Sequence, residues 1–217
     1  CSRGKRSRAR HSSSHHGIAC RMRALTLTSH GSLDQLRVQD VPDPVLSSPD
    51  QLRITMRAAA LNRLDLFVLQ GLPGVALQFP HVMGGDGAGV VESVGPAVTR
   101  FKPGDRVMIN PGLSCWNCEY CLAGEHSLCV SYRLLGEHVP GSIAELPVLP
   151  ERNLSPLPAV RSWETAAAYS RAPLTAWRMP ATRTAARPRV QRLITRLGGR
   201  LPPAAAPPAT PPPPSRP

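Results

Sequence analysis

The chain has 217 residues, and a formal net charge of +12 ordinarily points to a protein that binds nucleic acid. The location of the charge excludes this interpretation. Thirteen of the 26 Lys and Arg residues lie in 1–21 and 180–217, which contain no acid, so 22–179 carries thirteen bases against all 14 acids. A basic binding face on a folded domain is therefore not expected.

Residues 1–21 begin with Cys and contain Ile18 as their one large aliphatic residue, so they are not expected to form a core. They lack the apolar run of a signal peptide and the amphipathic leucines of a mitochondrial transit peptide. We interpret them as a disordered basic tail read through from upstream. Met22 is then the native start, because a strand pattern begins immediately after it.

From Met22 onward, apolar and polar side chains alternate in short runs, as is typical of half-buried strands. The expected strands are 23–28, 36–41, the first part of 51–61, 89–95, 105–110 and 141–149. One or two helical turns are expected at 65–71, closed by Gly71, and a helix is expected from an N-cap at Ser162 to about Trp177. Many short strands at close spacing predict a mainly β domain, either a barrel or a sandwich.

Four of the six cysteines lie within fifteen residues, at Cys115, Cys118, Cys121 and Cys129. The spacing C-x2-C-x2-C-x7-C lets one loop place four thiolates around a tetrahedral ion, and an all-thiolate set favours zinc. A closed four-cysteine shell leaves no position for water, so we expect one structural zinc per chain, in a lobe spanning 112–131. The alternatives are a four-iron cluster, whose last gap is normally three residues followed by Pro, and a pair of disulfides.

Residues 180–217 contain eleven prolines, seven arginines and no acid. This composition predicts a disordered tail, which we interpret as an out-of-frame translation. The chain also lacks a G-x-G-x-x-G fingerprint between a strand and a helix, since the glycine cluster 84–89 reads G-G-D-G-A-G and leads into a strand. A Rossmann-type dinucleotide-binding domain is therefore expected to be absent from this chain.

Taken in order, these landmarks resemble the N-terminal catalytic domain of the zinc-containing medium-chain dehydrogenase/reductase family over 22–179. The resemblance is carried by Gly84, Gly89 and Gly95, by the run Pro103-Gly-Asp-Arg-Val107, by the four cysteines and by Leu174-Thr-Ala-Trp177. It implies a GroES-like, partly open β-barrel with a structural zinc lobe and a few short helices. In the family, this domain is followed by a domain that binds NAD(P).

The resemblance also implies where a catalytic zinc would be held, and this sequence departs from the family there. The family's Cys position is Asn62, its His and Glu positions are Gly85 and Asp86, and its third ligand position falls near Arg171. Asn62 and Gly85 offer no strong metal ligand, and an isolated Asp86 is interpreted as a turn or strand-start residue. Leu64 stands where many alcohol dehydrogenases have a proton-relay hydroxyl. A second metal is therefore not expected.

Asn62 and Asp86 are the candidate catalytic residues. The Asn62 amide is able to hydrogen-bond a nicotinamide or a substrate carbonyl, and the alternative is that it caps the next helix. The resemblance places Arg63 on the cofactor pyrophosphate, with a solvated surface charge as the alternative. It places Thr175 against the nicotinamide, with helix packing as the alternative.

Oxidising an alcohol requires stabilising an alkoxide, which the family achieves with a catalytic zinc. Hydride delivery to a conjugated C=C or a quinone needs only hydrogen-bond donors, because the charge falls on a delocalised oxygen. We therefore expect the parent enzyme to be an NAD(P)-dependent oxidoreductase of activated C=C or quinone substrates, and this chain alone to be inactive. The alternatives are zinc alcohol dehydrogenase activity and a non-catalytic, zinc-stapled interaction module.

A zinc finger that binds nucleic acid is disfavoured, because 112–131 contains Glu119 and Glu125 and no Lys or Arg. The expected partners are a small-molecule substrate and, for the parent enzyme, further copies of itself, with no nucleic acid and no membrane. In the absence of a targeting signal, a cytoplasmic location is expected.

Overall fold

A computed structural model of the chain describes residues 21–173. Apart from Arg21, the two expected tails lie outside the described residues, and so do Thr175 and the expected helix end at Trp177. The interpretations of those segments stay predictions.

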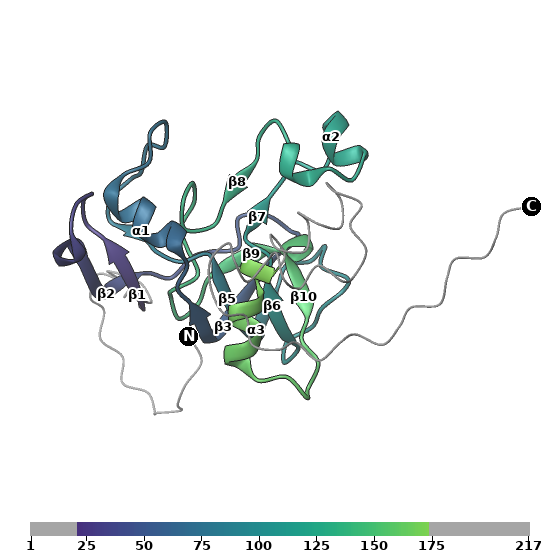
Figure 1. Cartoon of the computed structure of the whole chain (residues 1–217). Coiled ribbons are helices and arrows are strands. Elements are labelled where there is room, and N and C mark those ends of the chain that lie inside the picture. The colour runs from purple at the N-terminus through teal and green to yellow at the C-terminus, as the bar shows by residue number, and fades with distance from the viewer. Residues whose placement is uncertain (1–20, 174–217) are drawn as a thin grey trace, which may run out of the picture. The chain divides into compact units, whose positions relative to one another are not determined.

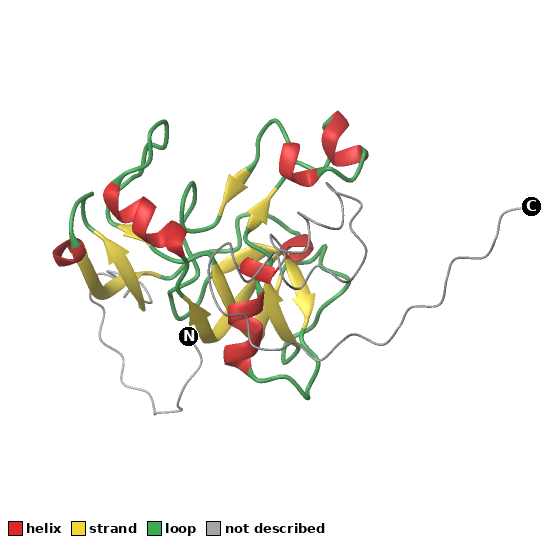
Figure 2. Cartoon of the chain, viewed as in Figure 1, coloured by secondary structure: helices red, strands yellow, loops and turns green. Residues whose placement is uncertain are grey.

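Two antiparallel sheets make up most of the domain (Figures 1 and 2), one in the order β2-β1-β4 and one in the order β10-β6-β5-β3-β9. A third, two-stranded sheet of β7 and β8 brackets the cysteine segment. The strands are β1 Arg21–Leu27, β2 Leu36–Pro42, β3 Gln51–Ala60, β4 His81–Val82, β5 Asp86–Val94, β6 Arg106–Ile109, β7 Gly112–Leu113, β8 Arg133–Leu134, β9 Val148–Pro150 and β10 Leu154–Pro156.

The helices are short. They are α1 Arg63–Gln70, α2 Glu119–Leu122 and α3 Trp163–Tyr169, with 3-10 turns η1 Leu33–Gln35, η2 His126–Leu128 and η3 Glu151–Asn153. Helix α3 packs against β3, β5 and β6, as Figure 1 shows, whereas α2 belongs to the cysteine lobe. Within residues 21–173, no helix is long and apolar enough to cross a membrane.

The main core lies against the five-stranded sheet. Alternate residues of a strand point to the same face, so Leu52 and Ile54 of β3 enter the core together and are fully buried. The same core contains Val91, Phe101, Val107, Ile109, Leu135, Leu149 and Leu154. The pairing of β3 with β5 shifts register between Arg53 and Ile54 and again between Met56 and Ala58. Such irregularities increase local twist and bend a sheet, and the result is the expected mainly β, partly open barrel.

The strand expected over 141–149 is wrong for most of its length, because only its end belongs to β9. The stretch before β9 exchanges backbone hydrogen bonds with both sheets. The N–H of Leu25 donates to Ile143, that of Met56 to Glu145 and that of Ile54 to Pro147. Because its partners change from one sheet to the other, this stretch forms no regular ladder with one neighbour.

Two of the expected helix boundaries are confirmed. Gly71 ends α1 with φ 94°, and its N–H donates to the carbonyls of Phe67 and Val68. Ser162 caps α3 by accepting the N–H of Thr165 at 3.2 Å. Helix α3 ends at Tyr169, and the expected helix end at Trp177 lies outside the described residues. Strand β5 begins at Asp86, three residues before the expected start.

Candidate functional site

The sulfur atoms of Cys115, Cys118, Cys121 and Cys129 form one cluster. All four lie within 4.8 Å of one another, and those of Cys115 and Cys121 are 3.9 Å apart. Sulfurs at about 2.3 Å from a tetrahedral zinc ion are about 3.8 Å apart, whereas a disulfide bond is about 2.05 Å long. The four side chains are free thiols. The disulfide alternative is therefore wrong, and the donor set fits a closed structural zinc site.

Backbone N–H groups point at these sulfurs. The Cys115 N–H donates to Cys129 Sγ at 3.2 Å, and the Cys118 N–H donates to Cys115 Sγ at 3.4 Å. Backbone hydrogen bonds lower the pKa of the thiols of Cys115, Cys118 and Cys129, which favours thiolates. Burial instead raises the pKa of Cys121 to about 12. A bound cation would therefore matter most for the deprotonation of Cys121.

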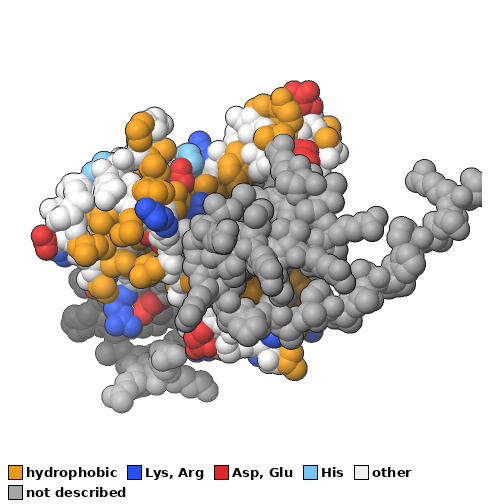
Figure 3. Space-filling model, viewed as in Figure 1, with side chains coloured by type: hydrophobic (Ala, Val, Ile, Leu, Met, Phe, Trp, Pro, Cys, Tyr) orange, Lys and Arg blue, Asp and Glu red, His pale blue; other side chains and the backbone are white. Residues whose placement is uncertain are grey.

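The lobe is attached to the domain by polar contacts at its base. Asn153 is buried, and its Nδ2 donates to the carbonyls of Asn110 at 2.9 Å and Gly112 at 2.7 Å. The Arg152 guanidinium lies 6.0 Å from the ring centroid of Trp116. Figure 3 shows hydrophobic and acidic side chains together at the end of the lobe that carries α2, and no blue side chain is visible at that end.

A second polar cluster lies where α1 and β5 begin, and Asn62 joins the two elements. As the N-cap of α1, Asn62 accepts the N–H of Leu64 through Oδ1 at 3.3 Å. Its Nδ2 donates to Oδ2 of Asp86, also at 3.3 Å. Because the cap requires the oxygen to face Leu64, the nitrogen must face Asp86, and one of its two N–H groups is left for another acceptor. Asn62 therefore caps α1 and contacts Asp86 at the same time.

Asp86 is 3% exposed and occupies the first position of β5. Its backbone oxygen accepts the hydroxyl of buried Ser142 at 2.8 Å, while its Oδ1 has no hydrogen-bond partner among the described residues. Burial raises the pKa of Asp86 to about 6, against the lowering effects of the Asn62 hydrogen bond and the Arg171 charge. A carboxyl group with this pKa can take up or release a proton near neutral pH.

Asp65 is the second buried carboxyl group of this cluster. Its Oδ2 accepts the backbone N–H of Asn62 at 2.6 Å, which completes a capping box at the start of α1. Burial raises its pKa, and the Asn62 hydrogen bond and the Arg171 charge lower it.

The cluster does not fit a second zinc ion. Gly85 has no side chain, Asn62 presents an amide N–H towards Asp86, and Arg171 is a cation with no lone pair to donate. Within residues 21–173, the four cysteines are the one group of three or more His, Cys, Asp or Glu side chains able to hold a metal. We therefore derive no catalytic step through a metal here.

Arg63 is exposed, and its guanidinium lies 5.8 Å from the ring centroid of Phe67, one turn along α1. This is an accessible position for a charged group, and its role towards a pyrophosphate stays a prediction. Leu64 packs against the small core formed around Leu27, Val68, Leu69 and Met83. Thr175 is outside the described residues.

Sequence reasoning missed Asp65 and Ser142, whereas the resemblance had already placed Arg171 near the family's third ligand position. Asp65 could have been predicted from the sequence, because Asn62-x-x-Asp65 has the spacing of a capping box. Ser142 carries no local signal, because its partner Asp86 lies 56 residues away in sequence.

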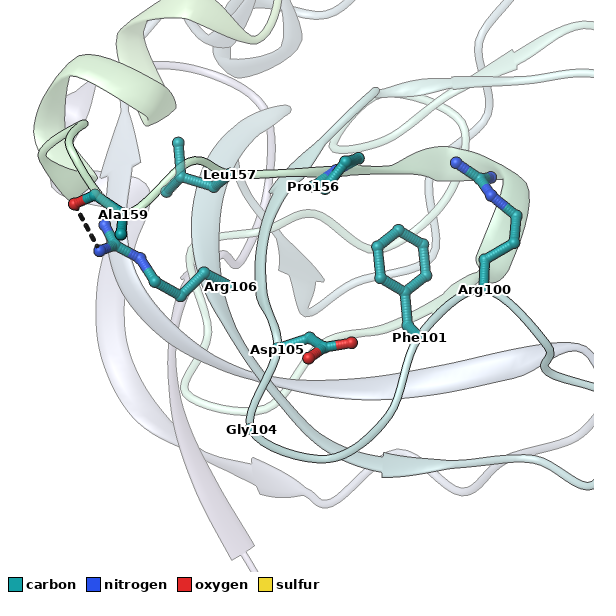
Figure 4. A pocket seen from close by; sticks show the side chains of 8 residues that line it. All are labelled: Arg100, Phe101, Gly104, Asp105, Arg106, Pro156, Leu157 and Ala159. Carbon is teal, nitrogen blue, oxygen red and sulfur yellow. Dashed lines mark hydrogen bonds between the residues drawn. The ribbon is translucent and has the colours of Figure 1, made fainter.

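An open surface hollow lies at another place in the fold, between the turn before β6 and the segment leading to α3 (Figure 4). Its lining residues are Arg100, Phe101, Gly104, Asp105, Arg106, Pro156, Leu157 and Ala159. The Arg106 guanidinium is held by the carbonyls of Ala159 at 3.0 Å and Arg161 at 2.6 Å. None of the residues of the Asn62–Asp86 cluster lines this hollow. Of its two arginines, Arg106 is engaged with backbone carbonyls and Arg100 lies over the Phe101 ring.

Comparison with known proteins connects this geometry to a family. Residues 48–159, just over half of the chain, match the alcohol dehydrogenase GroES-like domain. The alcohol dehydrogenase of Schizosaccharomyces pombe is 31% identical over 158 residues, which are 71% of this chain and 44% of that protein.

Two solved structures have the same fold. An NAD-dependent alcohol dehydrogenase is 51% identical with a TM-score of 0.70, over 73% of this chain and 46% of that one. The cobalt- and zinc-bound thermostable alcohol dehydrogenase of Pyrobaculum aerophilum is 32% identical with a TM-score of 0.68, over 75% and 48% of the two chains. The chain thus spans about half the length of the relatives it matches.

Proposed function

Because this chain belongs to the alcohol dehydrogenase GroES-like domain family, we propose that it forms the substrate-side domain of an NAD(P)-dependent oxidoreductase that interconverts a carbonyl compound and an alcohol. The three relatives described above are named alcohol dehydrogenases. Their names favour the alternative from the sequence analysis over reduction of C=C bonds and quinones.

One observation carries the proposal: Asn62 donates to a buried carboxyl group whose second oxygen has no partner among the described residues. Asn62 keeps one N–H that is able to donate to a substrate oxygen. Asp86, with its pKa raised to about 6 by burial, is able to hold the proton that the oxygen receives when a carbonyl is reduced. Bound NAD(P)H supplies the hydride.

Ser142 and the capping of α1 hold these two side chains in place. Ser142 donates to the backbone oxygen of Asp86, and Asn62 is held by the N–H of Leu64. Groups fixed in this way need little reorganisation when charge develops on the substrate oxygen. In the opposite direction, the Asp86 carboxylate accepts the proton of the alcohol.

The four cysteines would hold one zinc ion with a structural role. Their closed shell leaves no position for a substrate, so the ion stabilises the lobe and takes no part in turnover. We further propose Arg63 as the contact to a cofactor phosphate, which its exposure and its position next to Asn62 support. We further propose that the whole enzyme acts on a small molecule as a homo-oligomer.

The test uses a chimera, because the chain spans about half of its relatives. Residues 21–173 replace the matching domain of the NAD-dependent alcohol dehydrogenase that is 51% identical, and the unmodified enzyme is the control. Ketones and aldehydes with NAD(P)H, alcohols with NAD(P)+, enones and quinones are assayed with and without a chelator. Turnover of the carbonyl and alcohol pair that persists in chelator supports the proposal. A folded chimera that binds cofactor and turns over neither contradicts it.

A second candidate is reduction of a conjugated C=C bond or a quinone. The observation that favours it is the donor set at Asn62, Gly85 and Asp86, which does not hold a metal and so provides hydrogen bonds in place of a Lewis acid. Faster turnover of enones and quinones than of simple carbonyl compounds by the same chimera would select this candidate.

A further inference from the structure

Arg171 directly follows the end of α3, and a buried serine fixes its position. Ser170, the C-cap of that helix, is 3% exposed. Its hydroxyl lies 3.3 Å from the carbonyl oxygen of Gly87 and 3.4 Å from that of Ala166, so it is able to donate to either. The contact with Gly87 attaches the end of α3 to the beginning of β5, where Gly87 is the second residue. Arg171 is thereby brought beside the residues that precede this contact, although they are more than eighty positions earlier in sequence.

The guanidinium of Arg171 occupies space that another residue would need for a side chain. A Cβ atom placed on Gly85 would lie 3.2 Å from Arg171 Nη1 and 3.2 Å from the carbonyl oxygen of Leu135. Arg171 Nη1 itself is buried. Gly85 therefore leaves room for this guanidinium, and a side chain at position 85 would bring its Cβ into tight contact with it, so that the guanidinium would have to shift.

Arg171 lies close enough to the carboxyl groups of Asp65 and Asp86 for its charge to act on both. The side chains that act on the Asp86 carboxyl group are Asn62, Arg171 and Asp65. The Arg171 charge lowers the pKa of both Asp65 and Asp86, against the effect of burial. Among the side chains that act on Asp86, this guanidinium is the one that carries a positive charge.

We infer that Arg171 supplies the fixed positive charge at the substrate-oxygen site, in the place where the metal-binding relatives would need a cation and where this chain has no metal ligands. The inference rests on the proposed function, since it assigns Arg171 to the oxygen of the same substrate. The ligand class is a carbonyl oxygen, or a small oxyanion that imitates the charge developing on it. A guanidinium suits this role because it is permanently charged and offers several N–H donors in one plane.

The reduction step balances with these groups. The hydride from NAD(P)H forms a C–H bond at the carbonyl carbon, and the π electrons of the C=O bond move to the oxygen. The oxygen takes the proton of the Asp86 carboxyl group, which leaves an alcohol, an Asp86 carboxylate and oxidised nicotinamide. Arg171 donates to the oxygen while the negative charge develops and then faces the new carboxylate. Its positive charge favours both the transition state and the product state.

The first arm of the test locates the charge by NMR on the full 217-residue chain, so it requires no turnover. The side-chain carboxyl carbon of Asp86 is assigned from its loss in Asp86→Asn and titrated in the parent, Arg171→Met and Arg171→Lys. Removing the charge should raise the Asp86 pKa by about one pH unit, whereas Lys should keep it close to the parent value. Arg161→Met, which removes an exposed arginine near the other end of α3, is the matched control and should change nothing. An unchanged pKa in Arg171→Met would overturn the inference, whatever the chimera does.

The second arm of the test asks whether the site binds the oxygen atom of a small ligand. Acetate is the probe, and the side-chain N–H signals of Arg171 and Asn62 are followed as its concentration rises. Saturable shifts of both signals in the parent, with the Asn62 shift lost in Arg171→Met and kept in Arg161→Met, are expected. Equal shifts in the parent and in Arg171→Met would overturn the inference, because the oxygen would then bind without the guanidinium. Failure of the proposed function would appear separately, as a chimera that binds cofactor but reduces no carbonyl compound.

Discussion

Asn62 donates its side-chain N–H to Oδ2 of Asp86 at 3.3 Å and thereby joins the start of α1 to the start of β5. The same carboxamide caps the helix through its oxygen, so its orientation does not depend on a bound ligand. The pair places a hydrogen-bond donor beside a carboxyl group whose burial raises its pKa to about 6.

The raised pKa predicts how stability depends on pH. In the folded chain, Asp86 keeps its proton up to about pH 6, whereas in the unfolded chain it loses the proton near its ordinary value of 3.8. The folded state therefore binds more protons between these values, and the free energy of unfolding falls as pH rises through this window. Asp86→Asn should remove this loss and stabilise the chain at pH 7.5 by on the order of 2 kcal/mol.

Urea denaturation of the parent and of Asp86→Asn at pH 4.5 and 7.5 measures this difference. Asp40→Asn removes an exposed carboxylate from β2 and controls for the change in net charge. A stability gain of Asp86→Asn that is equal at both pH values would show that the buried carboxyl group is not its cause.

Asn62 has two roles that substitutions can separate. In the chimera described above, Asn62→Ala should lower kcat/KM for carbonyl reduction by about 10²-fold, because one donor to the developing oxyanion is lost. It should also cost about 1 kcal/mol of stability through the lost cap. Asn62→Ser keeps a capping oxygen, so it should recover the stability while the lost activity is recovered only in part. Full recovery of kcat/KM in the serine variant would mean that Asn62 acts only as a cap.

The cysteine cluster predicts one zinc per chain. Metal analysis of the purified chain should give about one equivalent from the four-ligand geometry, and Cys118→Ser should lose it and become less stable. Cys20→Ser, which changes a cysteine outside the cluster, should retain the metal. Two equivalents in the parent chain, or none, would contradict the assignment.

Gly89 lies where β5 passes close to β3. A Cβ atom there would lie 2.4 Å from the carbonyl oxygen of Thr55 and 2.8 Å from Cγ2 of Ile54. Because both atoms belong to a core strand, Gly89→Ala should cost about 2–3 kcal/mol through displacement of β3. Ser93→Ala on the same strand is the control for thermal denaturation. A Gly89→Ala variant as stable as Ser93→Ala would show that the two strands have room to separate.

Asn153 fixes the base of the cysteine lobe, since its Nδ2 donates to two carbonyl groups. Asn153→Leu keeps a similar volume but leaves the carbonyls of Asn110 and Gly112 without this donor, which should cost about 2 kcal/mol. It should also speed the release of zinc to a chelator, measured with a chromogenic dye. Asn117→Ala changes an exposed asparagine inside the lobe and provides the comparison. Equal release rates for the two variants would show that the lobe does not depend on its base.

The cysteine lobe and most strands follow from the sequence because the signals are local. The spacing of Cys115, Cys118, Cys121 and Cys129 predicts one metal site, since a short loop brings close cysteines together whatever the rest of the chain does. Leu52 and Ile54 alternate with polar residues, so their strand and its buried face are predictable in the same way. The same alternation predicted a strand over 141–149 wrongly. The backbone partners of this segment change from one sheet to the other, and the alternation of side chains gives no information about hydrogen-bond partners.

The sequence by itself determined the family resemblance, the metal site and the absence of strong ligands at Asn62 and Gly85. The resemblance also named the residues at those positions, and only the tertiary structure decided how their side chains are held and charged. Asn62, Asp86 and Arg171 come from α1, β5 and the end of α3, and they meet because Ser170 attaches that helix end to β5. The charge state of Asp86 depends on burial and on neighbours from these distant segments. Burial and proximity are properties of the packed chain, so no local pattern of residues could have predicted them.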